Sequence, residues 1–246
     1  MKHIPNSITA LNLASGFIAV IYAANGDIVS ASWLILAAMI FDFLDGLSAR
    51  LLKSYSDIGK ELDSLADVVS FGVAPAIIVY QLLSRSVSLS VPVFTDGLAF
   101  KSLIVLVIPA VMPVLAGLRL AIFNTDSSQA TSFKGLPTPA NALAVISLAI
   151  ADHYTGFSLY DWFTGSAAAL IILTLVLSLL MISRLPLLSL KFADLKFRGN
   201  EGRFILAGLV LISLIAFGPG AAPLIIPFYI IVSLLSLLFW PEVKTA

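Results

Sequence analysis

Residues 42–67 read DFLDGLSARLLKSYSDIGKELDSLAD and place four aspartates, Asp42, Asp45, Asp63 and Asp67, between two long apolar segments. A carboxylate at membrane depth costs about 2.5–3.5 kcal/mol on insertion scales. Four carboxylates in one hairpin therefore need a counter-charge, and a divalent cation is the simplest one. We expect the flanking helices to meet at this hairpin around a metal site.

The composition is that of a membrane protein. Of the 246 residues, 59% are hydrophobic and 11% are charged, whereas a soluble domain carries about 25% charged residues. The 14 basic and 14 acidic residues cancel, so we expect no nucleic-acid partner. The sequence contains no cysteine, which excludes disulfides and thiolate metal sites.

Eight segments are apolar enough to be spanning helices, each of which needs about 20 residues (roughly 17–25). We expect them at residues 8–24, 29–51, 61–84, 101–122, 138–152, 163–183, 204–217 and 221–239. The last two can form one broken hairpin around Gly218-Pro219-Gly220. We therefore predict an all-α polytopic membrane protein whose single domain covers residues 1–246.

The basic residues indicate how the chain is oriented. With eight spans, one side of the membrane holds twelve of the 14 Lys and Arg residues, and the other side holds Arg85 and Lys101. Cytoplasmic loops carry an excess of Lys and Arg. We therefore expect both termini, the hairpin 42–67 and the loop 123–137 on the cytoplasmic side of the inner (cytoplasmic) membrane.

Helical spacing predicts that the acidic side chains face one another. Asp42, Asp45 and Ala49 share one face of the second predicted helix, and Asp63 and Asp67 share one face of the third. Oxygen ligands suit a hard cation such as Mg²⁺ or Mn²⁺. Four carboxylates can hold two such ions, which lie about 3.5–4 Å apart in two-metal sites and clamp phosphoryl oxygens.

Other residues of the hairpin suit a ligand that carries phosphate. Gly46 and Ala49 leave space beside the second helix, so a bulky ligand can approach the backbone. Arg50 offers a planar guanidinium that matches a diphosphate. Gly59 permits a tight turn or close helix packing.

Two other interpretations of the aspartates remain open at this point. They can be helix caps and surface charges at the membrane edge. They can also form an ion or proton pathway, as in a cation transporter, because intramembrane acids often mark transport. The transporter hypothesis leaves the spacing of Gly46, Ala49 and Arg50 without a purpose.

The complete spacing from Asp42 to Asp67, D-x2-D-G-x2-A-R-x8-G-x3-D-x3-D, resembles the signature of the CDP-alcohol phosphotransferases, and every fixed position is present. The resemblance implies a six-helix membrane core, at about residues 5–200, with about two additional helices at residues 204–239. It also implies transfer of a substituted phosphoryl group from a CDP-linked donor to an alcohol, with release of CMP.

The same resemblance implies roles for individual residues. The four aspartates would bind two divalent ions, Mg²⁺ or Mn²⁺, and Asp67 would also be the general base. The residues implied to contact the CDP-linked donor are Asn6, Thr9, Gly46, Ala49, Arg50 and Ser56.

Three further stretches are similar to the integral-membrane phosphatidylserine synthases of this family: LDSLADVVSFGVAPA at 62–76, GLRLAIFN at 117–124 and FKGLPTPAN at 133–141. That similarity implies CDP-diacylglycerol as donor and L-serine as acceptor, with glycerol 3-phosphate and inositol phosphate as alternative acceptors. Serine carries a carboxylate, so its pocket needs a cation, for which Arg119 and Lys134 are the candidates. The sequence leaves the oligomeric state open, a homodimer included.

Overall fold

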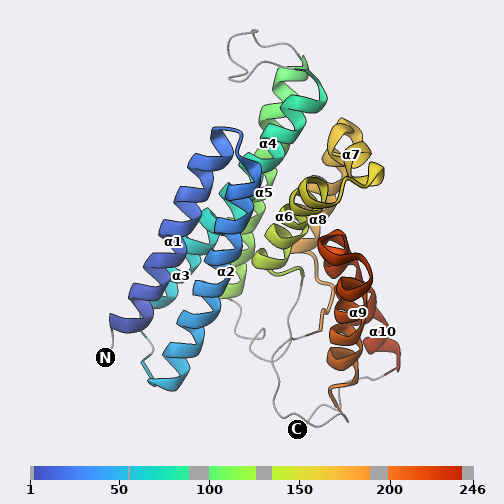
Figure 1. Ribbon diagram of the computed structural model, residues 1–246. Coiled ribbons are helices and arrows are strands. Elements are labelled where there is room, and N and C mark those ends of the chain that lie inside the picture. The colour runs from blue at the N-terminus through green and yellow to red at the C-terminus, as the bar shows by residue number, and fades with distance from the viewer. Residues whose placement is uncertain (1–2, 55, 89–99, 126–134, 189–198, 240–246) are drawn as a thin grey trace.

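The computed structural model describes residues 3–54, 56–88, 100–125, 135–188 and 199–239, and every regular element within these ranges is helical (Figure 1). In chain order the elements are α1 (His3–Ala24), α2 (Ile28–Leu51), α3 (Asp57–Asp67), η1 (Val68–Val73), α4 (Ala74–Ser86), α5 (Phe100–Thr125), α6 (Thr138–Thr155), α7 (Ser158–Gly165), α8 (Ala167–Ile182), α9 (Glu201–Phe217), η4 (Gly218–Leu224) and α10 (Ile225–Phe239). The prediction of an all-α polytopic membrane protein is confirmed.

The number of candidate membrane spans in the described ranges is lower than the eight expected. Five helical stretches are long and apolar enough: His3–Ala24, Ile28–Leu51, Asp57–Ser86, Leu103–Thr125 and Glu201–Phe239. The pair α7 and α8 makes a sixth if it is one span, although it bends by 81°.

The break between α7 and α8 accounts for one of the missing spans. Two further features account for the others. The helix α6 is short and carries polar residues near both of its ends. The stretch Glu201–Phe239 folds back at η4, so that α9 packs against α10 (Figure 1). Each of these two helices alone is shorter than the roughly 20 residues that a span needs.

Small residues allow neighbouring helices to cross η1 closely, as is common in membrane bundles. A Cβ atom on Gly16 of α1 would lie 2.7 Å from the Cα atom of Ser70. The Ser70 hydroxyl donates to the Asn12 carbonyl oxygen at 3.1 Å. On another side, a Cβ atom on Gly72 would lie 3.1 Å from the Cα atom of Pro113 in α5. The segment η1 is therefore held between α1 and α5.

The segment η1 is a π-helix within the continuous stretch from α3 to α4, which the sequence predicted as one regular helix over 61–84. Such segments are rare and frequently occur at functional sites. Its wider turn changes which face the chain presents to the bundle. The acidic side chains of α3 and the apolar side chains of α4 can therefore both point inward.

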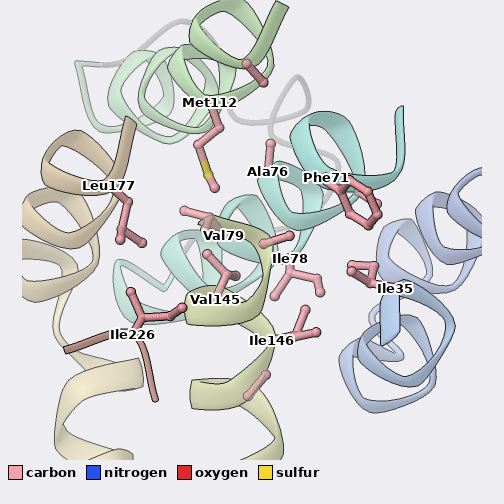
Figure 2. Close-up of a cluster of buried hydrophobic side chains, with 14 of the residues drawn as sticks. Ile35, Phe71, Ala76, Ile78, Val79, Met112, Val145, Ile146, Leu177 and Ile226 are labelled. Carbon is pink, nitrogen blue, oxygen red and sulfur yellow. The ribbon is translucent and has the colours of Figure 1, made fainter. Parts of the chain in front are cut away.

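The apolar core joins helices from both halves of the chain. Figure 2 shows its members Ile35, Phe71, Ala76, Ile78, Val79, Met112, Val145, Ile146, Leu177 and Ile226, which come from α2, η1, α4, α5, α6, α8 and α10. Within a membrane such a core is held by close van der Waals packing. Large exposed apolar side chains, among them Phe17, Val114 and Ile215, lie on the outside of the bundle.

Candidate active site

Three carboxylates converge where α2 meets α3. Asp42, Asp63 and Asp67 each offer one oxygen atom, and these atoms lie within 4.8 Å of one another. Asp67 is 8% exposed, and the other two are partly buried. Negative charges this close repel one another strongly where water is excluded. The cluster therefore suits a bound hard cation with oxygen ligands.

Unpaired oxygen atoms support the fit to a metal ion. Among the described residues, Oδ1 of Asp63, Oδ1 of Asp67 and Oδ2 of Asp45 are buried and have no hydrogen-bond partner. Buried polar atoms nearly always have a partner, and each exception needs an explanation. A divalent cation ligated by these oxygens provides that explanation.

Asp45 lies beside the three carboxylates and is 6% exposed. It interacts electrostatically with Asp42 and Asp63. The hydroxyl of Thr9 in α1 lies close to the Asp45 carboxylate, and it donates its hydrogen to the Pro5 carbonyl oxygen at 3.0 Å. The structure thus brings all four aspartates of the hairpin together and places Thr9 against them.

A second group of expected site residues meets at the start of α3. Ser56 is the N-cap of this helix, and its hydroxyl accepts a hydrogen bond from the Gly59 backbone N–H at 3.0 Å. A Cβ atom on Gly59 would lie 2.8 Å from Oδ1 of Asn6. The side chains of Asn6 and Ser56 therefore both lie against Gly59. A side chain at residue 59 would displace them.

The other residues that are expected to contact the CDP-linked donor, Gly46, Ala49 and Arg50, lie near the end of α2. Among the described residues, no atom outside the adjacent turns of α2 lies within 4 Å of the position that a Cβ atom on Gly46 would take. Arg50 is exposed, and its Nε donates to the Gly46 carbonyl oxygen at 3.0 Å. Ala49 is partly buried beside them. An accessible backbone next to a guanidinium suits a ligand that carries phosphate.

Arg119 of α5 lies near Asp67. Its side chain is 8% exposed and interacts electrostatically with the Asp67 carboxylate. Its Nε has no hydrogen-bond partner within the part of the chain that the structure describes. Arg119 is thus a buried cation with an unused N–H beside the cluster. Lys134, the other expected cation, lies outside the described residues.

Two residues of α6 belong to this region although the sequence analysis assigned them no role. The Thr138 hydroxyl donates to Oδ2 of Asp67 at 3.4 Å. Asn141 lies one turn further along the same helix face. It is fully buried, and neither amide atom has a partner among the described residues. Both residues belong to FKGLPTPAN at 133–141, one of the three stretches that resemble the phosphatidylserine synthases.

The backbone just before α6 fixes the position of Thr138. Gly135 has φ of 76°, a left-handed conformation that favours glycine. A Cβ atom there would lie 2.5 Å from the Met181 carbonyl oxygen. The Gly135 N–H donates to the Leu185 oxygen at 2.8 Å, and the Leu136 N–H donates to the Leu180 oxygen at 2.9 Å. The end of α8 therefore anchors the start of α6.

A family model described as CDP-alcohol phosphatidyltransferase matches residues 2–181, which contain the carboxylate cluster, Arg119 and Thr138. The chain belongs to this family. The resemblance seen in the spacing of the aspartates is thereby confirmed, and the CDP-alcohol phosphatidyltransferase region ends before α9 and α10.

The chain is also similar to curated members of this family. It is 34% identical to a CDP-diacylglycerol–serine O-phosphatidyltransferase of Helicobacter pylori over 239 residues, which is 96% of this chain and 91% of the relative. It is 34% identical to the enzyme of the same name from Bacillus subtilis over 185 residues, 75% of this chain and 89% of the relative. An archaetidylserine synthase of Methanothermobacter thermautotrophicus is 34% identical over 158 residues, 63% of this chain and 61% of the relative.

Proposed function

We propose that this chain is an integral membrane enzyme that transfers the phosphatidyl group from CDP-diacylglycerol to L-serine, giving phosphatidylserine and CMP. The observation that carries the proposal is the buried cluster of Asp42, Asp63 and Asp67 with Arg119 near it. The names of the relatives that share 34% identity with this chain support serine as the acceptor. Family membership removes the basis for the cation-transporter hypothesis.

The proposed metal ligands are the carboxylates of Asp42, Asp45, Asp63 and Asp67, with two Mg²⁺ or Mn²⁺ ions as the bound metal. The unpaired oxygen atoms of three of these residues support the assignment. When bound, such ions neutralise phosphate charge and stabilise the oxygen that leaves phosphorus. The proposed contacts to the donor are Asn6, Thr9, Gly46, Ala49, Arg50 and Ser56, which lie on α1, on α2 and at the start of α3.

Asp67 is the proposed general base. Thr138 occupies its Oδ2, whereas its Oδ1 has no partner among the described residues. Asp67 takes the proton of the serine hydroxyl, and the serine oxygen forms a bond to the phosphorus that carries diacylglycerol. The bond from this phosphorus to the CMP oxygen breaks, and CMP leaves with the electron pair. Arg50 offsets part of the charge on CMP. Direct attack predicts inversion at phosphorus and no covalent enzyme intermediate.

Arg119 is the proposed partner of the serine carboxylate. Its buried guanidinium has an unused N–H beside Asp67, so one acceptor molecule can present its carboxylate to Arg119 and its hydroxyl to Asp67. A charge-assisted hydrogen bond of this kind is about twice as strong as a neutral one. Glycerol 3-phosphate and inositol phosphate are the alternative acceptors, since each also carries an anionic group.

We also propose that the carboxylate cluster and both termini face the cytoplasm. The excess of Lys and Arg on that side of the predicted topology supports this orientation. The open space beside Gly46 supports entry of the donor from the cytoplasmic leaflet, with its acyl chains still in lipid.

The test is CMP release by the purified protein from CDP-diacylglycerol in mixed micelles, with and without a divalent metal and a panel of alcohols. We expect release only when both metal and acceptor are present, with L-serine as the best acceptor. A clear preference for glycerol 3-phosphate or inositol phosphate would show that the serine assignment is wrong and would leave the family assignment intact.

A further inference from the structure

One buried side chain of α1 carries polar atoms that the described residues leave unpaired. Asn12 is 0% exposed, and neither Oδ1 nor Nδ2 of its amide has a hydrogen-bond partner within the described ranges. An unpaired buried amide is unfavourable because it has lost its bonds to water. Buried polar groups nearly always have a partner, and each exception needs an explanation. The packing of the bundle gives none for Asn12.

Two contacts place Asn12 beside the carboxylate cluster. It lies one helical turn after Thr9, whose hydroxyl is close to the Asp45 carboxylate. The Asn12 carbonyl oxygen accepts a hydrogen bond from the Ser70 hydroxyl at 3.1 Å. Ser70 belongs to η1, which begins directly after Asp67. Asn12 is therefore next to the turn of helix that follows the proposed general base.

The direction of the Asn12 side chain follows from the buried face of α1. Thr9, Asn12 and Gly16 all belong to this face, whereas the neighbouring Leu11 is 51% exposed. Residues three and four apart lie on the same side of a helix. Thr9 at one end of this face lies close to the cluster, and Gly16 at the other end packs against Ser70. The amide between them therefore points into the bundle.

The amide of Asn12 suits a ligand that both donates and accepts hydrogen bonds, because Oδ1 accepts and Nδ2 donates. The phosphates of the CDP-linked donor only accept, so they would leave Oδ1 unpaired. The nucleoside end of the donor is proposed to bind at Asn6, which lies six positions earlier, or about 9 Å along a helix that rises 1.5 Å per residue. An amino acid, by contrast, carries an ammonium group that donates and a carboxylate that accepts.

The ammonium group of serine is the part of the acceptor that has no assigned partner so far. Asp67 takes its hydroxyl proton and Arg119 pairs with its carboxylate in the proposed transfer. The amino and hydroxyl groups of serine are on adjacent carbon atoms, so the ammonium must be bound close to Asp67. A neutral amide oxygen can accept from it without adding another negative charge to the aspartates.

We propose that Oδ1 of Asn12 accepts a hydrogen bond from the ammonium group of the acceptor. Asn12 then selects an amino alcohol over an alcohol of the same length that has no amino group. This inference rests on the proposed transfer to serine and adds a residue that determines its specificity. It gives Asn12 no contact with the donor or with a metal ion.

The test compares L-serine with 3-hydroxypropionate, which keeps the hydroxyl and the carboxylate of serine but lacks the amino group. CMP release gives kcat/KM for each acceptor with wild type and with Asn12→Leu, which replaces the amide by an apolar side chain of similar volume. A hydrogen bond to a charged group corresponds to about tenfold to a hundredfold in affinity. We expect kcat/KM for serine to fall by this factor and the value for 3-hydroxypropionate to stay nearly unchanged. An equal fall for both acceptors would overturn the proposal.

Two controls separate recognition of the ammonium from other roles. Ser178→Ala removes a hydroxyl on α8 that is also buried and without a partner among the described residues, and it should leave the ratio of the two kcat/KM values unchanged. Thermal stabilisation of Asn12→Leu by Mn²⁺ should equal that of wild type. A loss of this stabilisation would make Asn12 a metal ligand and would overturn the proposal.

Three provisions keep the test decisive. If turnover of 3-hydroxypropionate is too slow to measure, its inhibition constant against serine takes the place of kcat/KM. If Asn12→Leu does not fold, the smaller Asn12→Ala is judged by the same ratio. A wild-type protein that fails to use serine would refute the proposed function. A wild-type protein that uses serine, with an unchanged ratio in the Asn12 variant, would refute this inference alone.

Discussion

Thr138, the first residue of α6, donates its hydroxyl to the Asp67 carboxylate from 71 positions further along the chain. The carboxylate therefore receives both a side-chain hydrogen bond and the positive end of a helix dipole, which favours a negative charge. The backbone at Gly135 and Leu136 fixes this arrangement against the end of α8. Asp67 is thus oriented by a helix to which it has no local connection.

Replacement of this hydroxyl should reduce turnover without unfolding the protein. Thr138→Val keeps the shape of the side chain and removes a hydrogen bond worth about 0.5–1.5 kcal/mol, so we expect kcat to fall about twofold to tenfold. Thr174→Val is the matched control, because among the described residues that buried hydroxyl donates within its own helix, to the Leu170 oxygen 2.7 Å away. Equal kcat values for the two variants would mean that Thr138 does not orient the base.

Asp67→Asn should abolish turnover and change how the fold responds to metal. General acid–base catalysis alone is worth about 10²–10⁴-fold in rate. Removal of one negative charge from the cluster also relieves repulsion, so the variant should melt at a higher temperature than wild type in the presence of EDTA. Stabilisation by Mg²⁺ or Mn²⁺ should become smaller. Asp57→Asn is the control for both turnover and melting temperature, because Asp57 is an exposed aspartate at the start of α3, the helix that carries Asp67.

The two arginines should affect different substrates. Arg119→Ala removes a contact to the serine carboxylate worth roughly 1.5–3 kcal/mol, which corresponds to about a tenfold to hundredfold higher KM for serine. Arg50→Ala should instead raise the KM for CDP-diacylglycerol. Initial rates with each substrate varied in turn decide the matter. A defect of Arg119→Ala that falls only on the donor would remove this residue from the acceptor pocket.

Gly16→Ala should destabilise the fold, because the new methyl group would lie 2.1 Å from the Ser70 hydroxyl oxygen and 2.7 Å from the Ser70 Cα atom. Overpacking of this kind costs about 1–3 kcal/mol. Gly208→Ala is the control, since in the part of the chain that the structure describes no atom outside the adjacent turns of α9 lies within 4 Å of the added Cβ position. The readout is the midpoint of thermal unfolding in detergent. Equal midpoints would show that α1 and η1 can separate without cost.

Asn141→Leu should stabilise the protein and lower its activity. Its amide is fully buried with neither polar atom paired among the described residues, and such a group costs about 1–3 kcal/mol. An apolar side chain of similar volume removes that cost, together with any contact to a substrate. Thermal unfolding and CMP release are measured on the same preparation. A variant that is both stabilised and fully active would assign Asn141 to packing alone.

The sequence predicted the carboxylate cluster because the information is local. Asp42, Asp63 and Asp67 lie on two helices joined by a short turn, so their spacing is enough to bring the side chains together. Asn6 was expected as a contact to the CDP-linked donor because of the family resemblance alone, and its position against Gly59 is a finding of the structure. Their roles as ligands and donor contacts stay predictions.

The sequence did not predict the residues that reach the site from distant helices. Thr138 and Asn141 are single polar side chains in an apolar helix, and the contact of Thr138 with Asp67 arises only from the packing of the bundle. The bend between α7 and α8 was also missed, because composition gives the length of an apolar segment and not its direction. The hydroxyl of Ser166 accepts a hydrogen bond from the Ala169 N–H and so starts a new helix there.

A membrane helix tolerates a change of residue far more readily than a change in the number of residues. Each position added to or removed from an α-helix rotates everything beyond it by about 100°. Deletion of one residue within Val68–Val73 would tighten the wide turn of η1 and swing Asp63 and Asp67 away from Asp42, while α4 kept its place in the core. We therefore expect insertions and deletions in this stretch to be incompatible with activity, even where single substitutions are tolerated.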